Sequence, residues 1–248
     1  MPTLKAAPSL PNALSAAERV DRIDWDRMAG DLAAGGSAVA RQLLSQEECE
    51  ELTALYAQDS IFRSRVVMAR YAFGKGEYRY FSYPLPDLVG ELRTAFYPHL
   101  APIANDWNAR MRVHGRYPST HAEYLDLCRR GGQTRPTPLL LQYGSGDYCC
   151  MHQDLYGDLI FPMQVVILLA EPGRDFTGGE FLLVEQNPRG LSKAEVVPLR
   201  QGDAVVFAVN QRPARSVRGT ARVNLRHGVS RLHSGHRHTL GLIFHDAK

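Results

Sequence analysis

A change in sequence pattern at Pro138 limits the fold more than any other feature of this chain. From there to the C-terminus, short runs rich in β-branched and aromatic residues alternate with turns rich in Gly, Pro, Asn and Asp, which is typical of all-β structure. Strands are predicted over eight ranges: 139–143, 148–153, 163–169, 180–184, 195–199, 204–208, 225–231 and 238–244. Eight short strands suit a double-sheet jelly roll, also called a double-stranded β-helix.

The N-terminal half has a different pattern, with helix signals and one hairpin. Residues 1–20 are rich in Ala, Pro and Ser with little periodicity, and are interpreted as a flexible tail. The helices are predicted over residues 24–34, 46–58, 88–111 and 121–130, and the two strands of the hairpin over 66–71 and 77–83. We therefore expect the α+β class in one structural domain, with a support region of helices and strands at 21–137 and the jelly-roll core at 138–248.

The composition is that of a folded protein without a membrane segment. Hydrophobic residues make up 44% and charged residues 22% of the 248 residues, which is too apolar for a disordered chain. The longest apolar stretch, residues 165–170, is far shorter than the roughly 20 residues that span a bilayer. We recognise no secretory signal and expect a cytoplasmic location. Four scattered cysteines are expected to be reduced: Cys49, Cys128, Cys149 and Cys150.

Two potential metal ligands, His152 and Asp154, lie two positions apart in or beside a predicted strand. Residues i and i+2 of a strand share one face, so both side chains can project into the mouth of a barrel. His121 and Glu123 have the same spacing, but they fall in a predicted helix, where such positions point to nearly opposite sides. Taken alone, the pair of His152 and Asp154 also fits ordinary turn and surface residues.

A third ligand must come from a distant histidine, and five residues compete for the role: His227, His233, His236, His238 and His245. We favour His227, because it lies in the penultimate predicted strand and precedes Arg237 by 237 − 227 = 10 residues. Two histidines and one carboxylate on one face of an iron leave the opposite face open, as in non-haem Fe(II) oxygenases.

Arg237 enters the last predicted strand, where its side chain would line the barrel. A buried guanidinium is costly unless an anion pairs with it, and its planar fork fits a carboxylate in bidentate geometry. The anion could be an acidic cosubstrate or a carboxylate of the protein itself. Thr239, two residues further on, shares the face of Arg237.

Together these residues resemble the signature of the Fe(II)- and 2-oxoglutarate-dependent dioxygenases, which reads HxD, a distant H, and then RxT. Here it stands at residues 152–154, His227 and residues 237–239. The similarity extends through residues 178–181 (Gly-Gly-Glu-Phe) and 202–207, so it covers about the whole C-terminal half.

A looser similarity at residues 39–55 is to the first strand and helix of many prolyl-hydroxylase-like members. The closest likeness is to a bacterial oxygenase group thought to act on damaged nucleic acid. The resemblance implies that O2 and 2-oxoglutarate are consumed, that succinate and CO2 are formed, and that a substrate is hydroxylated or oxidatively demethylated. Ascorbate is a candidate reductant. By resemblance, Fe(II) would be bound by His152, Asp154 and His227, and 2-oxoglutarate by Arg237, Thr239 and Tyr143.

A basic stretch leads into this site and bears on the substrate. Between Asp203 and Asp246 there is no acidic residue, and seven arginines lie from Arg212 to Arg237. Such a cluster could bind nucleic-acid phosphates, although a solvated strand edge explains it equally well. Four aromatic residues of the predicted hairpin could stack a base or simply belong to a half-buried strand: Tyr78, Tyr80, Phe81 and Tyr83.

Two other functions remain open. A peptide or amino-acid hydroxylase of the prolyl type would share every residue of the iron site. A non-catalytic jelly-roll protein that binds a metal or ligand would keep the fold without turnover, although the intact triad and the arginine argue against it.

Overall fold

The computed structural model describes residues 14–155, 157–186, 190–216 and 219–248. Most of the predicted tail, residues 1–13, lies outside the described residues. The rest of that prediction is wrong, because α1 (Ala16–Asp21) begins at a capping box and buries Ala16 and Val20. None of the helices in the described ranges is both long and apolar enough to cross a membrane.

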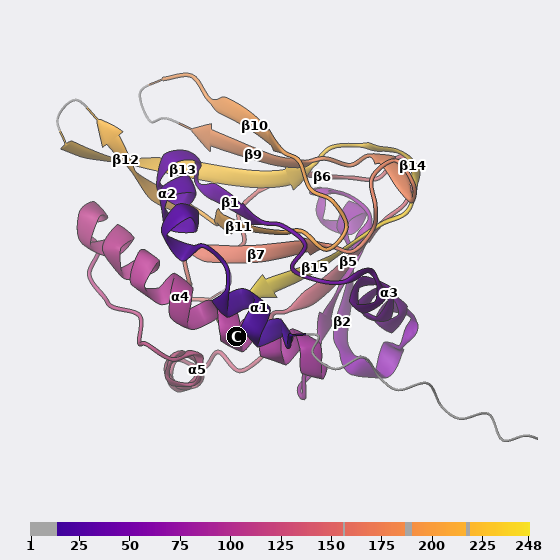
Figure 1. The fold of residues 1–248 in the computed structure, drawn as a ribbon, viewed down its shortest axis with the longest axis horizontal. Helices are drawn as coiled ribbons and strands as arrows, with labels where there is room; N and C mark the ends of the chain where they lie inside the picture. The colour runs from indigo at the N-terminus through magenta and orange to yellow at the C-terminus, as the bar shows by residue number, and fades with distance from the viewer. Residues whose placement is uncertain (1–13, 156, 187–189, 217–218) are drawn as a thin grey trace, which may run out of the picture.

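Two antiparallel sheets lie face to face and form the core (Figure 1). The larger sheet has the order β1 (Ser37–Ala40), β11 (Ala204–Ala208), β7 (Met163–Leu168), β15 (Arg237–Ile243), β5 (Leu139–Tyr143), β4 (Glu77–Phe81) and β2 (Phe62–Val67). The smaller has the order β10 (Lys193–Val197), β9 (Phe181–Gln186), β13 (Gly219–Val229), β6 (Tyr148–His152) and β3 (Gly74–Lys75), and β12 (Gln211–Ser216) also pairs with β13. This arrangement confirms the predicted α+β class with a jelly-roll core.

The strand predictions hold for most of the core. Strands β5 and β11 begin and end where predicted, and β6, β7, β9, β10 and β15 differ by a few residues at their ends. Strand β13 is longer than predicted because its first half forms a hairpin with β12. Besides β12, the sequence pattern missed β8 (Phe176–Gly178) and β14 (Leu232–Gly235), which pair with each other.

The predicted hairpin at residues 66–83 is only partly correct. Strand β2 ends at Val67 and pairs with β4, and residues 68–71 form a 3-10 turn. The predicted turn then crosses to the other sheet, where Gly74 and Lys75 pair with β6. Gly74 has φ 142°, and a Cβ there would lie 2.3 Å from the Tyr148 carbonyl oxygen. A glycine is therefore needed where the chain joins the two sheets.

Helices cover the outer face of the larger sheet (Figure 1). The predicted kinked helix is α4 (Asp87–Met111), which contains Pro98 and Pro102, and α5 (His121–Arg130) follows it with the predicted Thr120 cap. The other helices, α2 (Trp25–Gly35) and α3 (Gln46–Ala54), also begin at their predicted caps.

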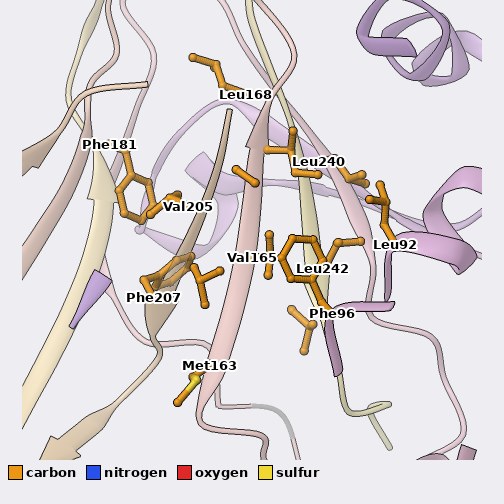
Figure 2. Packing of buried hydrophobic residues seen from close by; sticks show 14 of the residues in the cluster. Leu92, Phe96, Met163, Val165, Leu168, Phe181, Val205, Phe207, Leu240 and Leu242 are labelled. Atoms are coloured by element: carbon orange, nitrogen blue, oxygen red, sulfur yellow. The ribbon is translucent and has the colours of Figure 1, made fainter. Parts of the chain in front are cut away.

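The larger sheet is apolar on both faces. Figure 2 shows Phe207 on the side that faces Phe181 of the smaller sheet, and Leu242 on the side that faces Phe96 of α4. All four side chains are at most 3% exposed. Burial on both faces explains why the central strands β7 and β11 have nearly continuous apolar sequences.

Buried polar groups hold the C-terminus beneath α4. Arg93 and Asp246 form an ion pair at 2.8 Å with exposed fractions of 2% and 1%. The His121 Nε2–H donates to the Phe244 carbonyl oxygen at 2.8 Å. This ring nitrogen is therefore engaged in the fold, as expected for a histidine that shares only the sequence spacing of the potential metal ligands. The Phe161 N–H donates to Nδ1 of His245 at 3.2 Å.

Because His121 and His245 are buried, we expect stability to fall in acid. Burial, followed by the Arg93 charge, lowers the pKa of His121 to about 3 and that of His245 to about 4. The unfolded histidines titrate near ~6.5. The unfolded state therefore takes up protons first, and the stabilisation that is complete above pH ~6.5 is lost on acidification toward the folded-state pKa values. Each histidine should lower the free energy of unfolding by about 1.4 kcal/mol for each pH unit of acidification in this range.

Urea unfolding measured between pH 4 and pH 8 checks this expectation. The His245→Gln variant should have a smaller pH dependence than the wild type, because one titrating group is gone. Equal pH slopes for the two proteins would contradict the assignment to His245.

Candidate active site

Cross-strand pairing brings the three predicted ligands together. His152 ends β6, and its register partner on β13 is His227. The centroids of the two imidazole rings are 4.2 Å apart. Asp154 follows directly after β6 and reaches both rings: its Oδ1 is 3.4 Å from Nε2 of His152, and its Oδ2 is 3.3 Å from Nε2 of His227.

The donor atoms of these residues fit one divalent ion. One ligand atom from each residue lies within 4.8 Å of the other two. Two ligands bound about 2.1 Å from an ion at right angles would be about 3.0 Å apart, close to the observed separations. Nδ1 of His152 is 2.8 Å from the Cys150 carbonyl oxygen. That contact holds the proton on Nδ1 and directs Nε2 toward the cluster.

The electrostatics differ among the three ligands. Burial lowers the pKa of His152, but the hydrogen bonds with Asp154 and Cys149 outweigh it and raise that pKa to about 11, so binding of a metal would release a proton from this imidazole. Burial opposes ionisation of Asp154, but the hydrogen bonds with His152 and His227 hold the pKa of this carboxyl well below its usual range. Burial also lowers the pKa of His227, which favours the neutral imidazole that binds metal.

A bulge and a glycine shape the pairing of the two ligand strands. The β6–β13 register shifts between His227 and Val229, and Gly228 lies there against the carbonyl oxygen of Cys149. A Cβ at position 228 would be 2.7 Å from that oxygen and 3.0 Å from the sulfur of Met151. Bulges commonly orient a side chain beside an active site, and this one requires a residue without a side chain.

One cavity contains all six predicted site residues. It has a volume of about 240 Å³, lies between the sheets, and is lined by the metal cluster on one side and by Tyr143, Arg237 and Thr239 on the other. Arg237 and Tyr143 are register partners on β15 and β5. Thr239 is 1% exposed on the same face of β15.

Arg237 is a buried cation with unused hydrogen-bonding capacity. It is 2% exposed, and within the described part of the chain its Nε has no hydrogen-bond partner. Its guanidinium carbon lies 5.7 Å from the centroid of the Tyr143 ring and 6.0 Å from that of Phe176. Burial lowers the pKa of Arg237. An anion entering the cavity would offset this cost of burial.

The other four candidate histidines contribute no atom to the cluster found among the described residues. His233 and His236 are exposed. His238 points away from the cavity and contacts the ring of Tyr56, and His245 lies in the C-terminal network. The choice of His227 is thus supported by the geometry.

The arginines of the basic stretch lie in different surroundings. Arg212 is buried, donates to the carbonyl oxygens of Ala33 and Ala34, and pairs with Glu185. Arg222 donates to the carbonyl oxygen of Met111. Among the described arginines of this stretch, the exposed ones are Arg215, Arg222, Arg226 and Arg231, whereas Arg218 lies outside the described residues.

Of the four hairpin aromatics, Tyr78, Tyr80 and Phe81 are buried strand residues. Tyr83 is partly exposed, and its hydroxyl bonds to Asp246 and Arg93. Strand packing therefore explains the positions of Tyr78, Tyr80 and Phe81, in agreement with the interpretation as a half-buried strand.

Sequence reasoning missed several residues that line the cavity: Met68, Phe73, Cys149 and Gln164. Met68 and Phe73 reach it because residues 68–75 cross between the sheets. No local pattern indicates such a crossing. Gln164 had one weak signal, since it is the only polar residue in the apolar strand β7.

We expect Gly228→Ala to separate the two ligand strands, because the added methyl group would meet the Cys149 carbonyl oxygen. Metal affinity should fall about 10-fold or more, as when ligand orientation is disturbed in other metal sites. Titration calorimetry with Mn(II) measures this effect. Gly30→Ala is the matched control, because a Cβ at that position of α2 meets nothing within 4 Å. Equal metal affinities of the two variants would contradict the argument.

Comparison with known proteins places the chain among oxygenases. Residues 76–247 match the model of the Oxygenase-NA family, described as an oxygenase catalysing oxidative methylation of damaged DNA. Two uncharacterized proteins of Mycobacterium tuberculosis, MT2286 of strain CDC 1551 / Oshkosh and Rv2227 of strain ATCC 25618 / H37Rv, are each 47% identical over 167 residues. This is 67% of this chain and 72% of each relative.

Solved structures share the fold at low identity. A prolyl-4-hydroxylase of Pseudomonas putida matches with a TM-score of 0.51 and 14% identity over 90% of this chain and 99% of that chain. An oxidoreductase of the 2OG-Fe(II) oxygenase family from Burkholderia pseudomallei has a TM-score of 0.53 and 15% identity, covering 91% and 93%. A prolyl hydroxylase of Trichoplax adhaerens matches with a TM-score of 0.53 and 15% identity over 92% of this chain and 91% of that chain.

These likenesses confirm the predicted fold, and the family match confirms the predicted class of enzyme. The matched segment contains every predicted site residue and spans more than half of the chain. The chain therefore belongs to this oxygenase family and is an oxidoreductase.

Proposed function

We propose that this protein is an Fe(II)- and 2-oxoglutarate-dependent dioxygenase. His152, Asp154 and His227 would bind the iron, and Arg237 would bind the distal carboxylate of 2-oxoglutarate. The observation that carries this proposal is the buried Arg237, whose Nε lacks a partner in the described chain and which lines the same cavity as the metal cluster. A dicarboxylate that reaches from the metal cluster to the guanidinium would bind the metal at one end and accept hydrogen bonds from Arg237 at the other.

The donor set fits iron better than a closed structural site. Three protein ligands on one side of an ion leave positions open for a cosubstrate and oxygen. When bound, Fe(II) and 2-oxoglutarate would supply oxidative decarboxylation, with succinate and CO2 as products and an oxidant for a C–H bond of the substrate. Ascorbate would serve as a reductant that keeps the iron ferrous.

The residues of the chain would bind, orient and shield the reactants. Arg237 provides charge and a planar fork of donors, and its register partner Tyr143 keeps that fork in place from one side. Thr239 lies between Arg237 and the metal end on the same face of β15 and would offer its hydroxyl to the cosubstrate. The apolar cavity walls would limit access of water.

We propose damaged nucleic acid as the substrate, as the description of the family suggests. Support comes from an aromatic pair at the cavity wall. Phe73 lines the cavity and stacks on Tyr71, with ring centroids 5.9 Å apart and an angle of 19° between the planes. Tyr71 is 63% exposed, so the pair extends from the cavity to solvent. Exposed Arg70 and Lys75 lie beside it and could contact phosphates.

A prolyl-type peptide hydroxylase is the alternative, because the fold is shared with prolyl hydroxylases. The stacked pair and its basic neighbours favour a nucleobase over a peptide. A non-catalytic binding protein is disfavoured, since the metal cluster and Arg237 are both intact. We also propose a cytoplasmic location, which the four free cysteines suit.

Substitutions of the metal ligands and of Arg237 should have different effects, the first on turnover and the second on cosubstrate binding. We expect His152→Ala, Asp154→Ala and His227→Ala to abolish succinate formation, because each removes a metal ligand. Arg237→Ala should weaken 2-oxoglutarate binding about 10- to 100-fold through loss of a charged hydrogen bond. The weak visible absorption that appears when 2-oxoglutarate is added anaerobically to the Fe(II) protein reports this binding.

Arg226→Ala is the matched control for Arg237→Ala, because Arg226 neighbours His227 in sequence but is exposed. Its cosubstrate affinity should equal that of the wild type. A wild type without the absorption change, or an Arg237→Ala protein with unchanged affinity, would refute the proposed cosubstrate site.

The aromatic pair should contribute to binding of single-stranded DNA. Tyr71→Ala is expected to weaken binding roughly 10-fold, since base–aromatic stacking is worth about 1–3 kcal/mol, whereas Tyr71→Phe keeps the ring and should bind like the wild type. Fluorescence anisotropy with a labelled oligonucleotide measures the affinity. Leu191→Ala, at another exposed apolar residue, is the control. An affinity of Tyr71→Ala equal to that of Tyr71→Phe would rule out stacking.

A further inference from the structure

Gln164 is a buried amide that the fold does not use. It lies on β7, is 3% exposed, and lines the cavity of the metal cluster. Its Nε2 has no hydrogen-bond partner in the described ranges. A buried amide donor without a partner is unfavourable, and natural proteins seldom keep one without a reason.

The strand register places Gln164 at the metal end of the cavity. Its register partner on β11 is Phe207, and the ring of Phe207 lies 4.7 Å from the ring of His227. On β15 its partner is Ile243. Arg237 is six residues before Ile243 in the same strand and on the same face, about 20 Å away along the backbone. Gln164 and Arg237 therefore lie at opposite ends of one row of inward-facing positions.

The surroundings of Gln164 are apolar. Val166 and Gly241, which are register partners, line the cavity next to it. A Cβ at Gly241 would lie 2.8 Å from a methyl carbon of Leu139, so the Leu139 side chain covers this glycine and forms part of the apolar cavity wall. A flat group of low polarity would fit such walls, and the Gln164 amide would be a hydrogen-bond donor directed at it.

We infer that Gln164 is a specificity-determining residue that donates a hydrogen bond to an acceptor on the oxidised group, a ring nitrogen or carbonyl oxygen of a nucleobase. This inference rests on the proposed function, because 2-oxoglutarate held by Arg237 leaves the Gln164 end to the substrate. Hydrogen-bond readout of this kind discriminates strongly, since a ligand that lacks the acceptor leaves the buried amide unpaired.

A second buried glutamine, Gln133, shows the hydrogen bonding of an amide that serves a structural role. Gln133 is fully buried, and its Nε2 donates to the carbonyl oxygens of Leu159 and Asp246. Its Oε1 accepts from the N–H groups of Asp158 and Leu159. Every hydrogen-bonding position at Gln133 is thus used inside the protein, in contrast to Gln164.

Leucine substitutions at the two glutamines test the inference. Gln133→Leu removes a satisfied network and should lower the melting temperature. Gln164→Leu removes an unpaired donor and should leave the melting temperature of the free protein unchanged or raise it. A lower melting temperature of Gln164→Leu, comparable to that of Gln133→Leu, would show a structural role and overturn the inference.

Binding supplies the second readout. The probe is a labelled single-stranded DNA dodecamer with one central N-methylated base, added to the full chain loaded with Mn(II) and 2-oxoglutarate. Gln164→Leu should weaken binding about 10- to 100-fold, because it removes the donor. Gln133→Leu should bind like the wild type.

The outcomes separate this inference from the proposed function. If the wild type binds 2-oxoglutarate and the oligonucleotide but Gln164→Leu has wild-type affinity, the inference alone is wrong. If the wild type binds 2-oxoglutarate and a proline-containing peptide but not the oligonucleotide, the nucleobase assignment fails while the oxygenase chemistry stands. If the wild type does not bind 2-oxoglutarate, the proposed function fails and the inference fails with it.

Discussion

The pairing of β6 with β13 is the interaction on which the candidate site depends. It sets His152 opposite His227, and the chain leaving β6 then brings Asp154 between the two imidazoles. No single helix or loop could hold these residues, because they come from segments about 75 positions apart in sequence. The bulge at Gly228 belongs to the same design, since it lets the two strands approach without a side chain between them. Backbone hydrogen bonds therefore preorganise the ligands before any metal arrives.

The two sheets carry different parts of the chemistry. The smaller sheet holds the metal cluster, whereas the larger sheet holds the buried cation and the unpaired amide, both on its inner face. Its outer face packs against α4 and is anchored by the Arg93–Asp246 pair. Unsatisfied polar groups inside an otherwise apolar cavity reduce the stability of the protein, and such departures from good packing are expected at functional sites. The rest of the core, apolar on both faces of the larger sheet, offsets this cost.

Strand alternation predicts which residues share a face, so it could pair His152 with Asp154 and Arg237 with Thr239, whereas the choice of His227 also needed its place ten residues before Arg237. His152 and Asp154 needed only one strand, and Arg237 with Thr239 only another. What could not be predicted depends on contacts between distant segments. The crossing of residues 68–75 is decided by pairing with β6, and the burial of Arg212 depends on the β12–β13 hairpin reaching α2. Charge and aromaticity in the sequence carry no information on such contacts, so the sequence could not decide between the two interpretations of the basic stretch and did not single out Tyr71.

The crossing segment has a consequence for how substrate range can change. The family match begins at residue 76, directly after the segment that supplies Met68, Phe73 and the exposed Tyr71. The backbone of this segment bonds to strand β6 at Gly74 and Lys75 and through the Phe73 carbonyl, which accepts from the N–H of Cys150. Its side chains can therefore be replaced while the pairing remains. Proteins that share the same metal and cosubstrate residues can thus differ in substrate through substitutions in this segment of fewer than ten residues, which includes none of the predicted site residues.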